Sequence, residues 1–572
     1  MFSNFWNTKE HNELWNSFQG SMNLPSIDHA CWKIQPVSST CILGSDVMED
    51  VGINYNTYLS THTIAGRQLV KSILNNPINN INILEQRKKA IDWCGKNAKT
   101  ITHSLMRLKE TEQYVAWMLA NPPALDDPSS PFHLCYPNSF FLKWLNYSGL
   151  ALDSLHLFRG LIQPSIHTFS PLSSLLAPYW FIRFKVGLPL PFLTYMKTAL
   201  KVAFEGFRPG LFALKGELIK YFMISVYIIL YIIHIVHQWN YASMIRTMRS
   251  QLMFYGKRIQ RYYKELQKIQ TLVPNWVFES FGGSSYKIPH HKGHPLITLY
   301  RIWFNSSELS KGINQVGILD IINACAHKLR QGHYCKANYI ETPSKIAGMG
   351  HPTLDMNQQT NPVSLKQNLI VTGPNAAGKS TYTRSILANQ LLAQTFGIVY
   401  GKSAFICPVD AIFSYMRVRD ETGTASLYEA ELKRCASILE IIEQYKDYRV
   451  LCFLDEPFHS TPPMEGTATS LAFVQLLGSY EKVRLVVTTH YHAMMSLEKE
   501  DPTLFKNVSM EAIENGERHY IFPYKLRNGS SSQCIAIELL ASHGFPRSLM
   551  ERAIKYKESL YATISKEYVG ST

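Results

Sequence analysis

The chain has 572 residues, which is too long for a single hydrophobic core. Its composition, 46% apolar and 17% charged, excludes an intrinsically disordered chain. The net charge of +14 is uneven, because residues 1–340 carry 34 Lys and Arg against 19 Asp and Glu, whereas residues 341–572 carry 23 against 24. The basic N-terminal part favours a polyanionic partner, either nucleic acid or an anionic membrane surface, although ordinary solubility charge remains an alternative.

The ten cysteines are scattered, without a C-x-x-C pair or a zinc-type spacing. We therefore interpret them as buried thiols of a reducing compartment. The first residues lack a basic segment that leads into an apolar run, so we expect no signal peptide. An intracellular location is predicted, without a choice between nucleus, cytoplasm and organelle.

The first third of the chain predicts helices. Residues 1–50 are polar and show no regular pattern, so we predict no helix or strand for them. Between residues 58 and 93 apolar positions recur at three and four, and Asn75-Asn76-Pro77 interrupts them, a pattern that predicts a helix, a turn and a second helix. The helical pattern continues over 96–120, and a Pro-rich linker follows over 121–131.

Residues 139–240 form an apolar insertion. The stretch 161–181 has no charged residue but holds three prolines, and 221–244 also lacks Lys, Arg, Asp and Glu. The second stretch approaches the roughly 20 apolar residues that span a bilayer. Because His234 and His237 would be costly at mid-membrane, a helix buried inside a bundle is the alternative. Both interpretations stay open, and a membrane contact through 217–240 is a candidate.

Residues 242–272 predict a basic amphipathic helix with interspersed aromatic residues. Such a helix could lie along a phosphate backbone or a layer of lipid headgroups. The alternative is a lever helix whose charged side chains only face solvent. The candidate DNA contacts are Arg258, Arg261 and Lys264.

A phosphate-binding loop is the most specific motif in the chain. Residues 369–371 predict a buried strand, 373–380 match G-x-x-x-x-G-K-S/T in full, and 382–394 predict a helix. Strand, loop and helix bring backbone N–H groups and a helix N-terminus to face a polyphosphate. The candidate nucleotide-binding residues are Gly373, Pro374, Asn375, Ala376, Ala377, Gly378, Lys379, Ser380 and Thr381. Of these, Lys379 would reach the β- and γ-phosphates and Ser380 would bind Mg²⁺.

Two further apolar strands end in residues suited to hydrolysis. Asp455 and Glu456 follow the apolar run 450–454, and His490 follows 483–489. Asp455 would hold Mg²⁺, and Glu456 would orient and deprotonate the attacking water. His490 could contact the γ-phosphate.

A polar loop over 419–431 opens another predicted helix. Ser426 and Glu429 have the spacing of a helix start. The same helix start could bind a phosphate held by a second molecule.

Five segments together resemble the MutS family of DNA mismatch-repair ATPases, which are ABC-type ATPases. Residues 372–381 resemble its T-G-P-N-M-G-G-K-S-T, and residues 455–466 keep the frame of D-E-I-G-R-G-T-S-T-Y-D-G. Residues 426–431 resemble S-T-F-M-x-E, and 488–491 resemble A-T-H-Y. Residues 529–553 are similar to the family's C-terminal helical dimerisation segment.

The resemblance implies a function and roles for single residues. Lys379 would meet the phosphates, Glu456 the water and His490 the γ-phosphate, with Ser380 and Asp455 on Mg²⁺. Ser426 would complete the site of another subunit, so the active form would be a homodimer or a dimer with another MutS-like chain. ATP hydrolysis would switch the grip of lever helices on double-stranded DNA that is mismatched or otherwise irregular.

The sequence also departs from the family pattern. The two N-terminal domains that recognise mismatches have no counterpart here, so the resemblance is to a shortened form. The apolar insertion replaces the DNA clamp, and no nuclease segment is expected. The alternative function is a membrane-associated MutS-like ATPase with weak or no mismatch recognition.

The predicted fold class is α/β, with a C-terminal ABC-type phosphate-loop ATPase domain joined to an all-α lever domain. The predicted boundaries are an extension over 1–50, the helical lever over 51–340, the ATPase over 341–528 and the dimerisation segment over 529–572.

Overall fold

The computed structural model describes most of the chain and divides it into two compact units. Unit 1 comprises residues 1–32, 107–268 and 288–309, and unit 2 comprises 33–106, 269–287 and 310–572. The described residues are 13, 16–20, 22, 41–53, 58–120, 130–205, 217–289, 293–416, 427–460, 462–515, 520–531, 533, 535–542 and 544–569.

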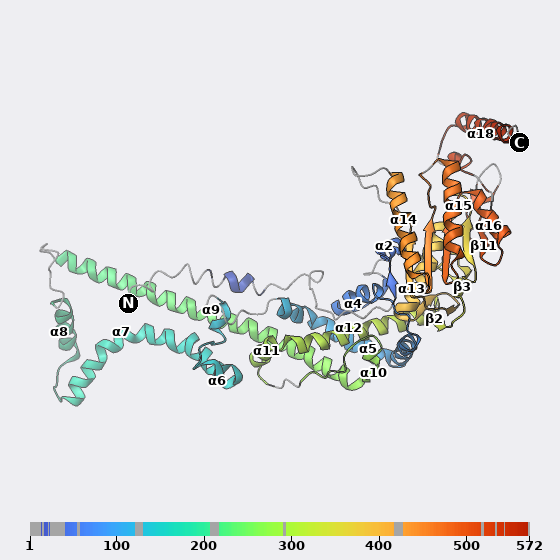
Figure 1. Cartoon of the computed structure of the whole chain (residues 1–572). Helices are drawn as coiled ribbons and strands as arrows, with labels where there is room; N and C mark the ends of the chain where they lie inside the picture. The colour runs from blue at the N-terminus through green and yellow to red at the C-terminus, as the bar shows by residue number, and fades with distance from the viewer. Residues whose placement is uncertain are drawn as a thin grey trace. The chain divides into compact units, whose positions relative to one another are not determined.

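A seven-stranded sheet forms the centre of the C-terminal part of unit 2 (Figure 1). Its strands, in spatial order, are β1 (Ile42–Leu43), β8 (Ala411–Tyr415), β9 (Val450–Asp455), β10 (Val483–Thr488), β5 (Asn368–Thr372), β11 (Phe505–Met510) and β14 (Leu526–Asn528). All neighbouring strands pair in parallel except β11 and β14. The confirmed α/β class follows from this sheet and the helices that connect its strands.

Continuous apolar strands explain why this sheet is parallel and covered on both faces. Every residue of β5 and of β8 is buried. The connecting helices are α13 (Lys379–Phe396), α14 (Leu427–Tyr445), α15 (Pro463–Ser479) and α16 (Ser496–Glu500), with a 3-10 turn η6 (His492–Met495). Phe413, Ile442 and Leu485 belong to the core cluster that the sheet shares with its helices. Burial of such side chains contributes about 1.5–3 kcal/mol each.

Two smaller sheets complete unit 2. A five-stranded sheet has the spatial order β4 (Asn361–Ser364), β3 (Lys345–Met349), β7 (Ser403–Ile406), β2 (Tyr334–Tyr339) and β6 (Ile398–Tyr400). The strands β12 (Ile513–Glu514) and β13 (Tyr520–Ile521) form a hairpin-like pair. Since β2 begins at Tyr334, this sheet starts a few residues before the predicted ATPase boundary at 341.

The predicted N-terminal extension also contributes to unit 2. Ile42 and Leu43 pair in parallel with Ala411 and Ile412 and so form an edge of the main sheet. The short helix α2 (Val47–Val51) follows, and its Asp50 accepts hydrogen bonds from Ser414 Oγ at 2.7 Å and from Met416 N at 3.2 Å. The boundary at residue 50 therefore separates segments that pack together.

Buried polar contacts hold helices of unit 2 together. The helix–turn–helix prediction matches α4 (Ile64–Leu74) and α5 (Ile81–Ala120). Asp320, on α12 (Ser306–Arg330), accepts a hydrogen bond from Thr63 N at 2.7 Å and one from Thr63 Oγ1 at 2.7 Å. A side chain at Gly66 would collide with Asp320, because its Cβ would lie 2.5 Å from Oδ2. The start of α4 is thus fixed against α12.

Unit 1 consists of helices. They include the end of α5 from residue 107, the start of α12, and η2 (Pro131–Leu134), η3 (Lys143–Tyr147), α6 (Gly149–Leu157), η4 (Phe158–Ile162), α7 (Gln163–Trp180), η5 (Phe181–Lys185), α8 (Phe192–Glu205), most of α9 (Glu217–Leu272) and α11 (Pro295–Phe304). The short helix α10 (Asn275–Glu279) belongs to unit 2.

The apolar part of α9 does not have the buried environment that a bundle helix would give it. Phe222 is 66% exposed, Ile229 55% and Ile232 53%. The prediction of a helix buried inside a bundle is therefore wrong for these side chains. No helix within the described ranges, α9 included, is both long and apolar enough to cross a membrane.

The C-terminal segment forms the helices α17 (Leu539–Ser542) and α18 (Arg547–Val569), as predicted for a helical end. Phe545, Leu549 and Tyr556 expose between 45% and 69% of their surface.

Candidate active site

The phosphate loop lies between the fully buried strand β5 and helix α13. Gly373 has a φ of 138°, and a Cβ there would lie 2.0 Å from the carbonyl oxygen of Met510, so only glycine fits. Ala376 also adopts a positive φ of 68°, in the left-handed region where side chains are uncommon. Because α13 begins at Lys379, its free N–H groups and positive dipole end face the loop.

Lys379 is buried and folded back onto its own loop. Its Nζ donates to the carbonyl oxygens of Gly373 at 2.8 Å and Pro374 at 3.4 Å, and it lies 3.9 Å from Glu456 Oε1. Burial lowers the pKa of Lys379, and the charges of Glu456 and Asp455 oppose that shift. Two neutral carbonyl oxygens, those of Gly373 and Pro374, thus hold the ammonium group over the loop. A bound anion could take their place as the hydrogen-bond acceptor.

The carboxyl ends of three adjacent parallel strands bring the acidic pair to this loop. β10 lies between β9 and β5, with Thr488 opposite both Asp455 and Val371. Asp455 Oδ1 accepts hydrogen bonds from Ser380 Oγ at 3.3 Å and from Thr488 Oγ1. Ser380 and Asp455, predicted from motifs 75 residues apart, therefore meet.

Glu456 and His490 form a direct pair. Their Oε1 and Nε2 atoms are 2.6 Å apart, and His490 Nε2 also lies 3.3 Å from Lys379 Nζ. Burial raises the pKa of Glu456, but the hydrogen bond and charge of His490 and the charge of Lys379 outweigh it, so the pKa lies below its usual value. The Glu456 backbone has a φ of 53°, a left-handed conformation that aims the side chain at the loop. The lowered pKa keeps the carboxylate ionised near pH 7.

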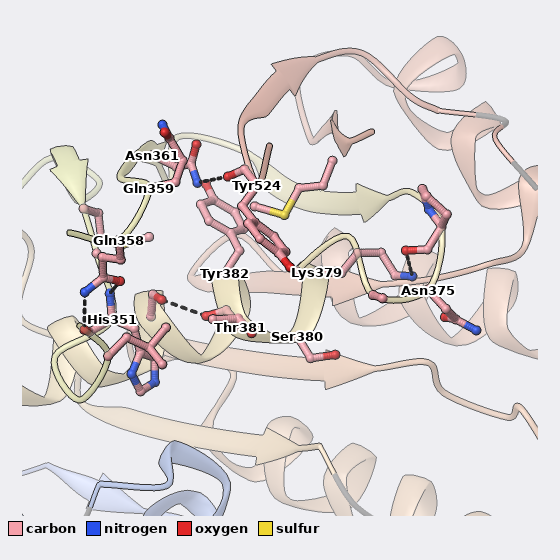
Figure 2. Close-up of a pocket in the computed structure, with 18 of the residues that line it drawn as sticks. His351, Gln358, Gln359, Asn361, Asn375, Lys379, Ser380, Thr381, Tyr382 and Tyr524 are labelled. Atoms are coloured by element: carbon pink, nitrogen blue, oxygen red, sulfur yellow. Dashed lines mark hydrogen bonds between the residues drawn. The ribbon is translucent and has the colours of Figure 1, made fainter. Parts of the chain in front are cut away.

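A cavity of about 600 Å³ extends from the phosphate loop, which is within the size range of small-ligand sites. Figure 2 shows its far side, where the backbone of His351 exchanges two 2.7 Å hydrogen bonds with the Gln358 amide. Tyr382 and Tyr524 line the cavity between the segment 351–358 and Lys379. Burial and the charge of Arg384 lower the pKa of His351 to about 4, so its imidazole is neutral near pH 7.

These cavity residues were not predicted as a site. No short motif marks His351, Gln358, Tyr382 or Tyr524 as a binding residue. The cavity forms because separate loops meet beside α13, which no short sequence pattern encodes.

Glu431 is a second residue that sequence reasoning left without a role. Its buried carboxylate, on α14, accepts hydrogen bonds from Tyr415 OH at 2.9 Å, His459 N at 3.0 Å and Ser460 N at 3.2 Å, and also from Ser460 Oγ. His459 Nδ1 lies 3.1 Å from the same carboxylate. Burial raises the pKa of Glu431, but the bonds from Ser460 and Tyr415 outweigh it and leave the pKa lowered. Glu431 thereby ties α14 to the loop that follows Glu456.

The remaining predicted residues lie elsewhere or outside the description. Ser426 falls outside the described residues, which resume at Leu427 where α14 begins. On α9, Arg261 and Lys264 are exposed, whereas Arg258 lies over the ring of Phe254 at 5.0 Å. The structure therefore brings the phosphate loop, Asp455, Glu456 and His490 together but places the candidate DNA contacts on a separate helix of unit 1.

Comparisons with known proteins agree with this geometry. Residues 369–561 match the sequence model of MutS domain V. The DNA mismatch repair protein MutS of Roseiflexus sp. (strain RS-1) is 29% identical over 259 residues, which are 43% of this chain and 23% of that protein. The DNA mismatch repair protein MutS of Roseiflexus castenholzii (strain DSM 13941 / HLO8) is 30% identical over 250 residues, 42% of this chain and 22% of that protein. The matches thus span less than a quarter of these relatives. The C-terminal part of the chain is therefore similar to domain V of MutS proteins.

Proposed function

We propose that the chain is an ATPase of the MutS type, which hydrolyses ATP to change its grip on DNA. The observation that carries this proposal is the convergence of the phosphate loop, Asp455, Glu456 and His490 at the carboxyl ends of β5, β9 and β10. In open parallel sheets this edge is where ligands bind.

The oxygen donors beside the loop fit Mg²⁺. The Ser380 hydroxyl and the Asp455 carboxylate are hard oxygen ligands of the kind that Mg²⁺ takes, and they already lie 3.3 Å apart. The ion would neutralise charge on the β- and γ-phosphates. Thr488 would orient the Asp455 carboxylate through its hydroxyl.

The chain's own groups supply the rest of the chemistry. Lys379 would exchange the Gly373 and Pro374 carbonyls for phosphate oxygens. Glu456, ionised because its pKa is lowered, would accept a proton from the attacking water. His490 would hold Glu456 until the nucleotide is bound and then turn to the γ-phosphate.

The cavity next to the loop would receive the nucleoside. Tyr382 and Tyr524 offer apolar ring surface, and the neutral His351 adds a third ring without charge. An aromatic base loses little by leaving water for such a lining.

Polar contacts offer a route from the ATP site to the long helix α5. Helix α13 begins at Lys379. The carbonyl oxygen of its penultimate residue, Thr395, accepts a hydrogen bond from the Arg87 guanidinium on α5. Arg87 also donates to Ser280 O at 3.1 Å and lies 4.7 Å from the Phe281 ring. Burial lowers the pKa of Arg87 to about 10, so the group keeps its charge at pH 7. A shift of α13 on nucleotide binding would therefore be transmitted to α5.

DNA is the partner that fits the charge and the family. Residues 1–340 carry the excess of positive charge, and Arg261 and Lys264 on α9 are exposed. We propose double-stranded DNA, mismatched or otherwise irregular, as the ligand. The Ser426 of a second copy, or of another MutS-like chain, would complete each ATP site.

The test is ATP hydrolysis by the purified chain with and without duplex DNA containing one mismatch, against perfect duplex and no DNA. Several phosphate contacts make binding steeply salt-dependent. Stimulation by DNA that fades between 50 and 200 mM salt supports the proposal, and a rate indifferent to DNA at both salts contradicts the DNA-coupled switch.

A further inference from the structure

The helices of unit 1 carry an extended apolar surface. We call the exposed apolar side chains of residues 158–193 and 222–236 the apolar surface. Five aromatic residues in it, Phe169, Trp180, Phe181, Phe184 and Phe222, are each 55–66% exposed. These rings alone leave on the order of 500 Å² open, since each has 150–250 Å² to bury. The exposed aliphatic residues of the same helices add to this area.

The polar contacts of these helices lie between them. Trp239 Nε1 on α9 donates to Thr168 Oγ1 on α7 at 3.0 Å, and Tyr231 OH donates to Thr168 O. Further along α9, the Arg246 side chain donates a hydrogen bond to the carbonyl oxygen of Gly160 on η4 at 2.7 Å. Two helices that hydrogen-bond to each other and present isoleucine and phenylalanine outward have the reverse of a water-soluble amphipathic pattern. This pattern, with polar contacts between the helices and apolar side chains on the outside, is typical of helices that face an apolar environment.

The charges at this surface select among the possible occupants. Residues 154–240 carry eight Lys and Arg against two Asp and Glu. Arg183, Lys185 and Lys197 are exposed beside the aromatic residues. A second copy of the surface would meet it with like charge, and a nucleic-acid backbone would leave the isoleucines in water. An anionic lipid interface satisfies both the apolar and the basic side chains.

We propose that the apolar surface docks on an anionic phospholipid bilayer. Its phenylalanine, tryptophan and isoleucine side chains enter the boundary between headgroups and acyl chains, and Lys185 and Lys197 contact the lipid phosphates. This interaction adds a membrane partner to the ATPase and does not depend on the DNA ligand.

The test is vesicle flotation of the full chain with pure phosphatidylcholine or with 30% phosphatidylserine. The variant Leu193→Gln, Ile229→Gln, Ile232→Gln removes three outward apolar side chains and should lower partition into anionic vesicles about 100-fold. The control replaces three similarly exposed residues of the ATPase part: Leu476→Gln, Ile513→Gln, Ile521→Gln. It should change partition less than threefold.

Charge and fold are tested separately. Lys185→Glu with Lys197→Glu should weaken flotation at least tenfold at 50 mM salt and much less at 500 mM, because the lipid surface potential is screened. An unchanged ATPase rate shows that each variant is folded. The proposal is overturned if the wild type does not float with anionic vesicles, or if the triple glutamine variant floats equally. It is also overturned if that variant only dissociates a dimer or only weakens DNA binding.

Discussion

Glu431 offers the sharpest test of how the ATP site is held in place. Its carboxylate accepts from Tyr415 and from both backbone N–H groups of His459 and Ser460, and it is fully buried. Glu431→Gln keeps the volume but turns one acceptor oxygen into an NH₂ donor that faces donors. At least two of these hydrogen bonds are lost, at ~1.5–3 kcal/mol each for a charged partner. Attachment of the loop to α14 should therefore weaken by about 3–6 kcal/mol.

This loop follows Glu456 directly, so its release should displace the general base. A 3 kcal/mol loss expressed in the hydrolysis step corresponds to about 100-fold in kcat. The KM for ATP should change less than threefold, because Glu431 does not contact the phosphate loop. Steady-state hydrolysis measures both constants, and chemical denaturation checks the fold. The control is Glu429→Gln, two residues away on α14, where the exposed carboxylate pairs with Lys433 at 2.9 Å.

Two results would refute this reasoning. If Glu431→Gln hydrolyses ATP at the wild-type rate, the carboxylate does not position the loop. If kcat and ATP affinity fall together, or if Glu429→Gln behaves in the same way, the effect is a general loss of structure.

Four other predictions follow from the same geometry. Glu456→Gln should retain ATP binding and lose at least ~100-fold in turnover, as removal of a general base does; equal turnover would exclude that role. Because the pKa of Glu456 lies below its ordinary 4.5, the carboxylate is lost only as the pH falls through that lower value, and the pH–kcat profile should show no limb from Glu456 between pH 5 and 8. Arg87→Lys should destabilise unit 2 by ~2–3 kcal/mol and reduce stimulation of ATP hydrolysis by DNA, since an ammonium group lacks the planar fork with which the guanidinium reaches both buried carbonyls; full stimulation would rule out that route. Arg261→Glu with Lys264→Glu should weaken DNA binding equally for all sequences in a fluorescence titration and flatten its salt slope, and an unchanged affinity would leave α9 as a lever only.

Local motifs in the sequence mark most of the residues that meet at the candidate active site. A strand, a glycine loop and a helix form within residues 368–396, and the acidic pair ends its own apolar strand. Parallel pairing then places Asp455 and Thr488 side by side, which joins motifs that are far apart in the chain.

Other parts depend on tertiary contacts and could not be predicted. The edge strand β1 has two residues, too few for a periodicity to detect. Glu431 ends the segment that resembles S-T-F-M-x-E, but that segment does not show that Tyr415 and Ser460 donate to its carboxylate. Hydropathy identified the apolar run of α9 but could not say that its side chains face outward, because burial depends on which helices pack nearby.

The most direct test of the central claim is the rate of phosphate release from ATP by the purified chain in Mg²⁺, with Lys379→Ala as the blank and duplex DNA present or absent. We predict Mg²⁺-dependent hydrolysis that Lys379→Ala abolishes and that DNA stimulates at low salt. Hydrolysis that persists in Lys379→Ala, or none from the wild type in any of these conditions, would contradict the assignment of this site.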